Sequence, residues 1–336
     1  MKEFSEALLD PFGLRMKRYT RSYGAFICDT DQGTVLVKSV DWSEGAIWFA
    51  HGVKEHVAAQ GFLWTDRYWL SQEGLPWAMD GGMRYTVRQW IKGEEADVSN
   101  APEAIAMAGL LGKLHRLGMH WEAAPKCGKA AKRYDDWPRQ MQKGYRQLQS
   151  YGKGMRKNGH YTEFDLMVLS CLEDNLQQAK EACHYFMGPL YTELARQMEE
   201  KKAVVHGSFA EHAVMVEAEA LHSRWLVSEF EQAAYAIPAE DCIALLEKVL
   251  RKNEWSVNLG MAMLEAYERE RPLETAEQQM IYAGLLFPSR LCKLCKEAYH
   301  LKRKWMPISY KRKLEELLAG QEKRKEFLRE LACMLR

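Results

Sequence analysis

Residues that could do chemistry are concentrated in the segment His206–Met215, which reads HGSFAEHAVM. Aliphatic pairs, Val204-Val205 and Val214-Met215, bracket this segment and fix its frame. Ser208 offers a neutral hydroxyl, which cannot act as a general base at pH 7, and Ala213 has no atom that can bind a metal. The segment therefore has the layout of a polar loop between two apolar runs, without a base or a metal ligand at those two positions.

Charged residues elsewhere in the chain could complete a site around this loop. Lys38 ends the β-type run Thr34–Lys38, and Glu55 lies on the predicted helix that follows, with Glu44 as a second choice of partner. Glu229 follows a later apolar run and supplies a carboxylate. A lysine on the solvent face of an apolar strand is common, so the order of these segments carries more weight than Lys38 alone.

That order resembles the kinase-like aminoglycoside and choline phosphotransferases. Their loop reads H-G-D-x-x-x-x-N, so Ser208 and Ala213 stand where the Asp and the Asn would be. Tyr85–Gly93 resembles the hinge that ends W-I-x-G, and Ala106–His115 resembles the A-x-x-L-x-x-L-H helix that follows it. Trp225–Glu231 resembles the strand that ends I-D-F-E, with Glu229 at the position of its Asp.

Two later segments extend the resemblance. Asp241–Trp255 is similar to a D-x-x-x-x-L-x-K helix with a later Trp, and Leu286–Pro288 followed by Tyr299 is similar to an F-P…Y segment. From Thr34 to Lys313 the ordered set resembles the CotS-type spore coat family, a bacterial branch of the aminoglycoside phosphotransferase-like kinases. It implies an α+β, two-lobed protein-kinase-like fold, with a small β-rich N-lobe at residues 1–89 and a large helical C-lobe at 90–336.

The resemblance also assigns roles to residues. In such kinases the strand Lys contacts the nucleotide phosphates and pairs with a helix Glu, and the later Asp holds magnesium. It therefore implies ATP and Mg²⁺ as cofactors, without requiring that either still binds. The implied positions are the catalytic ones, at His206, Ser208 and Ala213, and the nucleotide site, at Lys38, Glu55, Gln89, Trp90 and Glu229, of which Glu229 is the metal ligand.

The departures from that pattern predict a degraded active site. Loss of a general base costs ~10²–10⁴-fold in rate, and loss of a metal ligand adds to that. Gly24 is the single glycine between Arg18 and Cys28, where a phosphate-binding turn needs several free backbone amides. Glu211 and His212 would replace the missing base only if the loop shifted against its aliphatic frame.

Two functions follow. The first is a catalytically degraded kinase-like protein that acts as a structural or assembly protein of the spore coat and binds other coat proteins through its helical lobe. The alternative is a divergent ATP-dependent phosphotransferase that acts on a small molecule or a saccharide and uses Lys38, Glu55 and Glu229. The residues at 208 and 213 discriminate between them.

Hydrophobic periodicity predicts the elements that must position these residues. An acidic, Gly-ended break at residues 29–33 predicts a hairpin between the runs 23–28 and 34–40. Further strands are predicted at 62–70 and 85–91, and a helix at 43–60. From residue 102 the pattern is helical, with predicted helices at 104–117, 164–185, 190–198, 240–252, 258–267, 276–285 and 309–335.

Composition indicates which kinds of partner and which cellular compartment to expect. A formal net charge of +1 argues against nucleic acid as a partner, and no apolar run approaches the ~20 residues that span a bilayer. No signal peptide is visible, and eight scattered cysteines favour a reducing compartment. We expect a cytoplasmic protein, or a coat protein assembled from the mother-cell cytoplasm. Cys292 and Cys295, with His300 nearby, invite a zinc interpretation, but helical spacing and the lack of a second pair favour core packing.

Basic residues form two clusters. They fit either solvated helix faces or a docking surface for an acidic protein or an anionic polymer. The first comprises Lys126, Lys129, Lys132, Arg133, Arg139, Lys143, Arg146, Lys153, Arg156 and Lys157; the second comprises Lys293, Lys296, Lys302, Arg303, Lys304, Lys311, Arg312 and Lys313.

Overall fold

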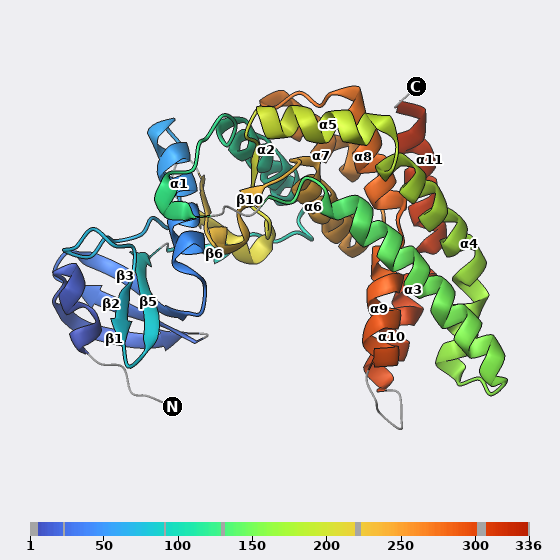
Figure 1. Cartoon of the computed structure of the whole chain (residues 1–336), viewed down its shortest axis with the longest axis horizontal. Coiled ribbons are helices and arrows are strands. Elements are labelled where there is room, and N and C mark those ends of the chain that lie inside the picture. Colours follow the sequence, from blue (N-terminus) through green and yellow to red (C-terminus); the bar gives the residue numbers. More distant parts are fainter. Residues whose placement is uncertain are drawn as a thin grey trace. The chain divides into compact units, whose positions relative to one another are not determined.

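The computed structural model describes residues 6–22, 24–90, 92–128, 132–218, 223–300 and 307–334. They form two compact units, whose elements are labelled in Figure 1. The first unit draws on residues 1–97, 113–132 and 202–235, and the second on residues 98–112, 133–201 and 236–336. The lobe boundary at residues 89 and 90 stays a prediction. Within the described part of the chain, no helix combines the length and the apolar character needed to cross a membrane.

A five-stranded antiparallel sheet with the strand order β1-β2-β3-β5-β4 dominates the first unit. Its strands are β1 (Met16–Ser22), β2 (Ala25–Thr30), β3 (Gly33–Val40), β4 (Ala78–Asp80) and β5 (Met83–Gln89). The predicted hairpin is confirmed, because Thr30 pairs with Gly33 across a two-residue turn. One face of this sheet buries Cys28, Val35, Val37, Tyr85 and Val87 against Leu8, Leu9, Phe12 and Leu14.

The predicted helix after β3 is confirmed as α1 (Glu44–Ala59), and the Ser43 side chain caps its first turn by accepting a hydrogen bond from the Ala46 amide. The predicted strand at 62–70 is wrong. This segment changes partner along its length, because Tyr68 forms an isolated bridge with β5 and Thr65 forms one with Val227. Neither bridge extends into a ladder, so the backbone stays irregular.

Short strands complete the first unit. A three-stranded sheet has the order β6-β8-β9, built from β6 (Glu94–Glu95), β8 (Val214–Ala218) and β9 (Ser223–Val227). A separate pair joins β7 (Val204–Val205) to β10 (Ala234–Tyr235). The single-turn helices η4 (Glu211–Ala213) and η5 (Phe230–Gln232) lie in the connections between them.

The second unit is helical. It contains most of α2 (Ala101–Leu117) and all of α3 (Asp136–Asn158), α4 (Glu163–Phe186), α5 (Pro189–Glu200), α6 (Ala239–Lys252), α7 (Val257–Glu270), α8 (Thr275–Leu286), α9 (Ser289–His300), α10 (Ile308–Ala319) and α11 (Gln321–Met334). The six predicted helices between residues 104 and 285 are confirmed. The single helix predicted at 309–335 is wrong, because Gly320 separates α10 from α11.

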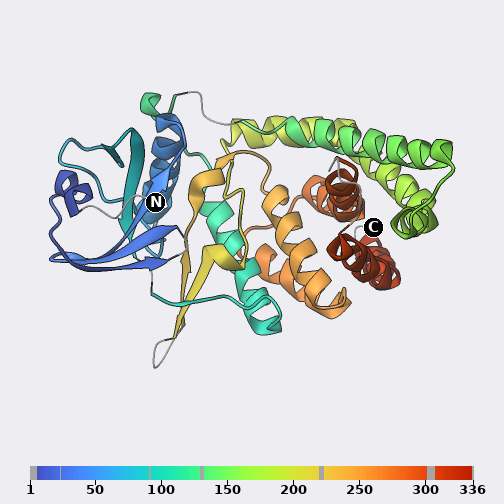
Figure 2. The same ribbon diagram turned by 90° about the horizontal axis from the view of Figure 1, so that it is seen from below.

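Helices α3 and α4 lie side by side, as both ribbon views show (Figures 1 and 2). Gly152 permits this approach, because a Cβ there would lie 2.4 Å from Cδ2 of Leu172. Leu148 and Leu172 share one core with α9 and α10, and that core includes Cys292 at its margin and the buried Cys295. The cysteine pair therefore packs in a core, as its helical spacing predicts, and the His300 side chain lies outside the described residues.

Candidate functional site

The candidate site lies within the first unit, where β7 leads into the predicted loop. His206 is buried and anchors that loop: its Nε2 donates to the Ser228 carbonyl oxygen at 2.8 Å, and its Nδ1 accepts from the Ser208 amide at 3.3 Å. Its ring also packs on Phe230, with centroids 4.7 Å apart. Because both ring nitrogens have hydrogen-bond partners, His206 holds the loop in shape.

Ser208 and Ala213, at the positions of the kinase Asp and Asn, both form hydrogen bonds within the chain. The Ser208 hydroxyl donates to the Glu229 carbonyl oxygen at 3.2 Å. Ala213 is fully buried, and its carbonyl oxygen accepts from the Ser228 amide at 2.8 Å. Val214 pairs with Val227, which fixes the frame of the loop in the way the aliphatic pattern predicts.

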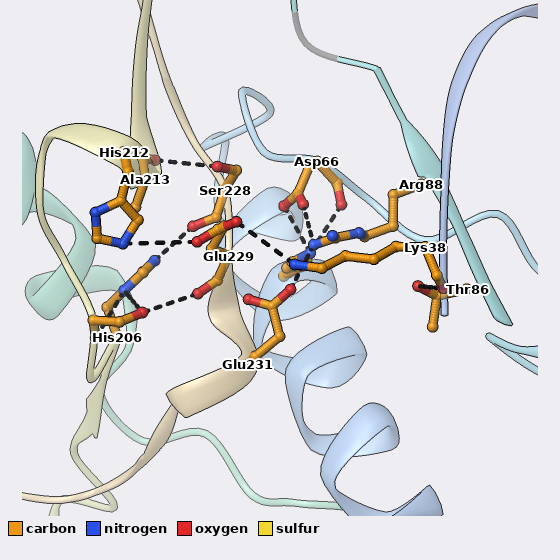
Figure 3. Close-up of polar contacts among 12 residues, drawn as sticks. Lys38, Asp66, Thr86, Arg88, His206, His212, Ala213, Ser228, Glu229 and Glu231 are labelled. Atoms are coloured by element: carbon orange, nitrogen blue, oxygen red, sulfur yellow. Dashed lines mark hydrogen bonds and ion pairs between the residues drawn. The ribbon is translucent and has the colours of Figure 1, made fainter. Parts of the chain in front are cut away.

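Glu229 lies between two basic side chains (Figure 3). Its Oε1 is 3.8 Å from Lys38 Nζ, and its Oε2 is 3.7 Å from His212 Nε2. Its backbone is left-handed, with φ of 61°, and this conformation turns the chain from β9 into η5. The structure therefore brings Lys38 and Glu229 together, and adds His212, which the sequence suggested only in a shifted loop.

The predicted pairing of Lys38 with Glu55 is wrong, and so is the second choice, Glu44. Arg67 takes Glu55, with its Nε donating to Glu55 Oε1 at 2.8 Å. Arg84 takes Glu44 at 3.0 Å. Both carboxylates thus pair with arginines that follow α1 in sequence. Lys38 pairs instead with Glu229, two residues after the end of β9.

The other two nucleotide positions, Gln89 and Trp90, have their backbone amides engaged. The Gln89 amide donates to the Arg67 carbonyl oxygen at 2.9 Å, and the Trp90 amide donates to the Thr34 carbonyl oxygen at 3.2 Å. The Gln89 side chain is exposed. These amides pair within the protein and are not turned toward a ligand.

A buried network of four charges lies beside the Lys38–Glu229 pair (Figure 3). Arg88 Nη1 contacts Asp66 Oδ2 at 2.7 Å and Glu231 Oε1 at 2.8 Å. Lys54, which is fully buried on α1, contacts Asp66 Oδ1 at 2.7 Å and lies over the Tyr68 ring at 4.3 Å. Two cations thus face two carboxylates, so the network is balanced without a ligand.

Burial and pairing act against each other in this network. Desolvation lowers the pKa of Lys54, although Asp66 opposes that shift. Desolvation also disfavours the charge on Arg88, but Asp66 and Glu231 outweigh it and raise the pKa of the guanidinium. The network therefore depends on its carboxylates, and removal of one of them would leave buried cations uncompensated.

Sequence reasoning missed this network, although two signals were present. Lys54 lies four residues from both Ala50 and Ala58, on the face of α1 that is otherwise apolar. Arg88 follows the apolar residues of a β-type run. A charged residue on a buried face indicates a paired interior charge, but the partner Asp66 lies in the segment that was mistaken for a strand.

The residues at the kinase metal and phosphate positions offer few ligand atoms for a magnesium–nucleotide complex. Across the described residues, no three His, Cys, Asp or Glu side chains converge in an arrangement that could hold a metal ion. Glu229, the remaining candidate ligand, faces two basic groups. β1 and β2 pair as far as Ser22 opposite Ala25, so only two residues connect them where several free amides would be needed to hold phosphates.

The chain also resembles known proteins in sequence. A family model described as "Spore coat putative kinase YutH" matches residues 5–331. Spore coat protein S of Bacillus subtilis (strain 168) is 22% identical over 310 residues, which is 90% of this chain and 85% of that protein.

Solved kinases share the fold. An aminoglycoside phosphotransferase from Alicyclobacillus acidocaldarius superposes with a TM-score of 0.87 at 18% identity, over 100% of this chain and 97% of that one. A microcompartment-associated aminopropanol kinase superposes with a TM-score of 0.59 at 12% identity, over 96% and 94% of the two chains. The predicted α+β kinase-like fold, with a small antiparallel N-lobe and a large helical C-lobe, is confirmed.

Proposed function

This chain belongs to the spore coat kinase family whose model matches residues 5–331, and we propose that it is a member without phosphotransfer activity that serves in assembly of the coat. On this proposal it works where the coat is assembled, from the cytoplasm of the mother cell. Its partners are other coat proteins, and it requires neither ATP nor magnesium.

The observation that carries the proposal is the loss of the base and of one metal ligand, at Ser208 and Ala213. The one acidic side chain left at the metal position contacts Lys38 and His212 instead of an open space. The catalytic positions add no other ligand, because Ser208 is bonded to the backbone of Glu229 and Ala213 is sealed in the core. Phosphoryl transfer depends on metal ions and a positioned base, and these contacts supply neither.

The alternative, a divergent phosphotransferase for a small molecule or a saccharide, is favoured by a different observation. Lys38 and Glu229 are both retained and lie 3.8 Å apart, so a nucleotide–metal complex would meet one cation and one carboxylate. Glu55 would not take part in this phosphotransferase site, because it pairs with Arg67.

Turnover distinguishes the two functions. Purified chain should release no phosphate from ATP above background when magnesium is in excess over ATP, and its melting temperature should not shift with ATP and magnesium together. Lys38→Ala is the matched control, since any activity that belongs to this site must disappear in it. Turnover that Lys38→Ala abolishes would contradict the proposal.

The helical unit offers a surface for the proposed protein partners. On α3, Arg139, Lys143, Arg146, Ser150, Lys153 and Lys157 are spaced by four, three, four, three and four residues, and all six are exposed. Such spacing places them in one stripe, about 27 Å long at 1.5 Å per residue. The helix contains no acidic residue after Asp136. We infer that this stripe docks an acidic segment of a coat protein.

The charges on the stripe are largely uncompensated. Arg139 pairs with Asp136 at 2.9 Å. Lys143, Arg146, Lys153 and Lys157 have no ion-pair partner within the described ranges of the chain, and Arg146 donates only to Gln142. Lys129 and the residues 302–304 of the two basic clusters lie outside those ranges. Unpaired, aligned cations on a rigid helix favour an acidic partner by charge complementarity.

A further inference from the structure

The second unit contains a pocket that the proposed function does not use. Its walls come from the α6–α7 connection, the α8–α9 connection, α10 and α11, and its volume is about 640 Å³. That volume lies within the range of small-molecule sites, which is ~300–1,000 Å³. Three features of its lining indicate the chemistry of a ligand.

The first feature is a cationic side chain with unused donors. Arg324 Nη2 donates to the carbonyl oxygens of Leu285 at 2.7 Å and Leu286 at 2.8 Å, and its Nη1 donates to Gln178 at 2.7 Å. A guanidinium has five N–H groups, and these bonds use three of them. The Nε–H and one N–H of Nη1 have no partner within the described residues. No carboxylate pairs with Arg324 there either, and desolvation lowers the pKa of its guanidinium to about 10.

The second feature is the start of α9, which is separated from Leu286 by Phe287 and Pro288. Ser289, Arg290 and Leu291 line the pocket and form the first turn of this helix. The first amides of a helix have no intrahelical acceptor, and its N-terminus favours a negative charge. The Ser289 amide already donates to the Phe287 carbonyl oxygen at 2.8 Å, so the amides of Arg290 and Leu291 are the ones available. Arg290 and Lys293 add two cations that form no ion pair with any described residue.

The third feature is an aromatic wall beside an unpartnered polar atom of a buried residue. Trp255 is 8% exposed and lies 5.7 Å from the Arg324 guanidinium. It and Glu254 have φ of 58° and 52°, and these left-handed residues end α6, with the Trp255 amide donating to the Leu250 carbonyl oxygen at 2.7 Å. Asn175 is 3% exposed and lines the pocket; its Nδ2 donates to Cys171, but its Oδ1 has no partner within the described chain.

We propose that this pocket binds a small organic anion with an aromatic body. Its carboxylate or phosphate group would lie at the first turn of α9, against Arg290, Lys293 and the free N–H groups of Arg324. Its ring would lie against Trp255 and Leu317, and a donor on that ring would reach Asn175 Oδ1. The lining also contains carboxylates, of which Glu247 accepts from Ser289 and Glu254 pairs with Lys323. The proposal does not depend on whether the chain transfers phosphate.

Calorimetric titration of the full chain with three probes tests this proposal. The probes are 1-naphthoate, 1-naphthyl phosphate and the uncharged 1-naphthamide. We expect at least one anion to bind with a Kd below about 1 mM, and the amide to bind at least about 10-fold more weakly. Tighter binding of one anion shows whether the site prefers a carboxylate or a phosphate group, and either result supports the proposal.

Variants locate the binding. Leu317→Trp fills the apolar part of the pocket and should abolish binding, while the double variant Arg290→Gln and Lys293→Gln should weaken it about 10-fold or more. Lys296→Gln is the matched control, because Lys296 is exposed on α9 and does not line the pocket. Arg324 itself is left intact, since it also caps α8, and circular dichroism checks that each variant folds. Absence of binding by both anions, equal binding of the amide, or binding unchanged in Leu317→Trp would overturn the proposal.

Discussion

Lys38 Nζ lies 3.8 Å from Glu229 Oε1, so the lysine of β3 faces the residue that follows β9 and not a carboxylate of α1. Both side chains are about one-third exposed. An ion pair at that exposure contributes at most about 1 kcal/mol, which is too little to keep a well-coordinated nucleotide out. The replacements at Ser208 and Ala213 therefore support the proposed loss of phosphotransfer better than the ion pair does.

A double-mutant cycle of Lys38→Ala and Glu229→Gln should show this weakness. We expect a coupling energy below about 1 kcal/mol in the free energy of unfolding, measured with urea at low salt and reduced further at 0.5 M salt. None of the four proteins should bind ATP more tightly when magnesium is added. A coupling above about 2 kcal/mol would mean that the pair is far less solvated than its exposure indicates.

Asp66 should matter much more than Glu55. Asp66→Ala leaves Lys54 and Arg88 buried with one carboxylate fewer, and breaking a buried pair in this way costs about 3–5 kcal/mol. Glu55→Ala breaks the partly exposed pair with Arg67 and should cost less than about 1 kcal/mol. The two substitutions remove equal charge, so urea unfolding of both separates burial from charge. Similar losses in the two variants would contradict the central role of Asp66.

Restoring the kinase residues should not restore a kinase. In Ser208→Asp, a hydroxyl that donates to the Glu229 carbonyl oxygen is replaced by a carboxylate, which cannot donate and would face that oxygen as a second acceptor. In Ala213→Asn, a larger polar side chain enters a fully buried position, and overpacking typically costs about 1–3 kcal/mol. We expect the double variant to lose stability and to turn over ATP far below the ~1–100 s⁻¹ usual for kinases. Turnover in that range would contradict the proposed function.

Glu240 should make stability depend on pH. Burial raises the pKa of this carboxyl from 4.5 to about 8, although Arg133 lies 3.9 Å away and opposes the shift. The folded chain then binds more protons than the unfolded chain between those values. This contribution to stability is therefore present below about pH 4.5 and is lost as the pH rises through about 8.

Glu240→Gln, which keeps the neutral shape, should flatten that dependence. Above pH 8 the variant should be more stable than the parent, by up to about 5 kcal/mol at about 1.4 kcal/mol per pKa unit, and the difference should shrink toward pH 5. Urea unfolding at pH 5, 7 and 9 measures it. A variant that loses stability equally at all three values would show that Glu240 is charged and paired with Arg133 in the folded chain.

Local patterns predicted most of the elements but not the site contacts. The hairpin at Thr30–Gly33 and the Ser43 cap follow from residues close in sequence, and the loop frame follows from Val214 opposite Val227. Helix α3 escaped prediction because it is strongly polar on average, although it is amphipathic: its buried residues are few and include Gly152.

The pairing of charges could not be predicted in the same way. Arg67 and Arg84 compete with Lys38 for the carboxylates of α1, and the outcome depends on where the irregular segment at 62–70 places Arg67 and Asp66. That segment takes its shape from two separate partners, Tyr68 with β5 and Thr65 with β9. Because those partners are distant in sequence, its residue pattern alone reads as a strand.

The basic stripe on α3 leads to the last prediction. Lys143→Glu, Arg146→Glu and Lys153→Glu together reverse its centre without touching the buried residues Leu148 and Met155. Binding of poly-L-glutamate, used as the model of an acidic protein segment, should weaken at least about 10-fold. Raising the ionic strength from 0.05 to 0.5 M should weaken binding by the parent chain as well, since the screening length falls from about 14 Å to about 4 Å.

A control variant carries the same change of charge elsewhere. Lys17, Lys180 and Lys296 are exposed and lie outside the stripe, so their replacement by Glu should leave poly-L-glutamate binding within about 3-fold of the parent if position matters more than net charge. Equal losses in the two triple variants would show that overall charge is sufficient. Duplex DNA and vesicles with anionic lipid serve as competing probes at the same salt. If either binds to the stripe and poly-L-glutamate does not, the partner is not an acidic protein, and the proposed docking of coat proteins on α3 is wrong.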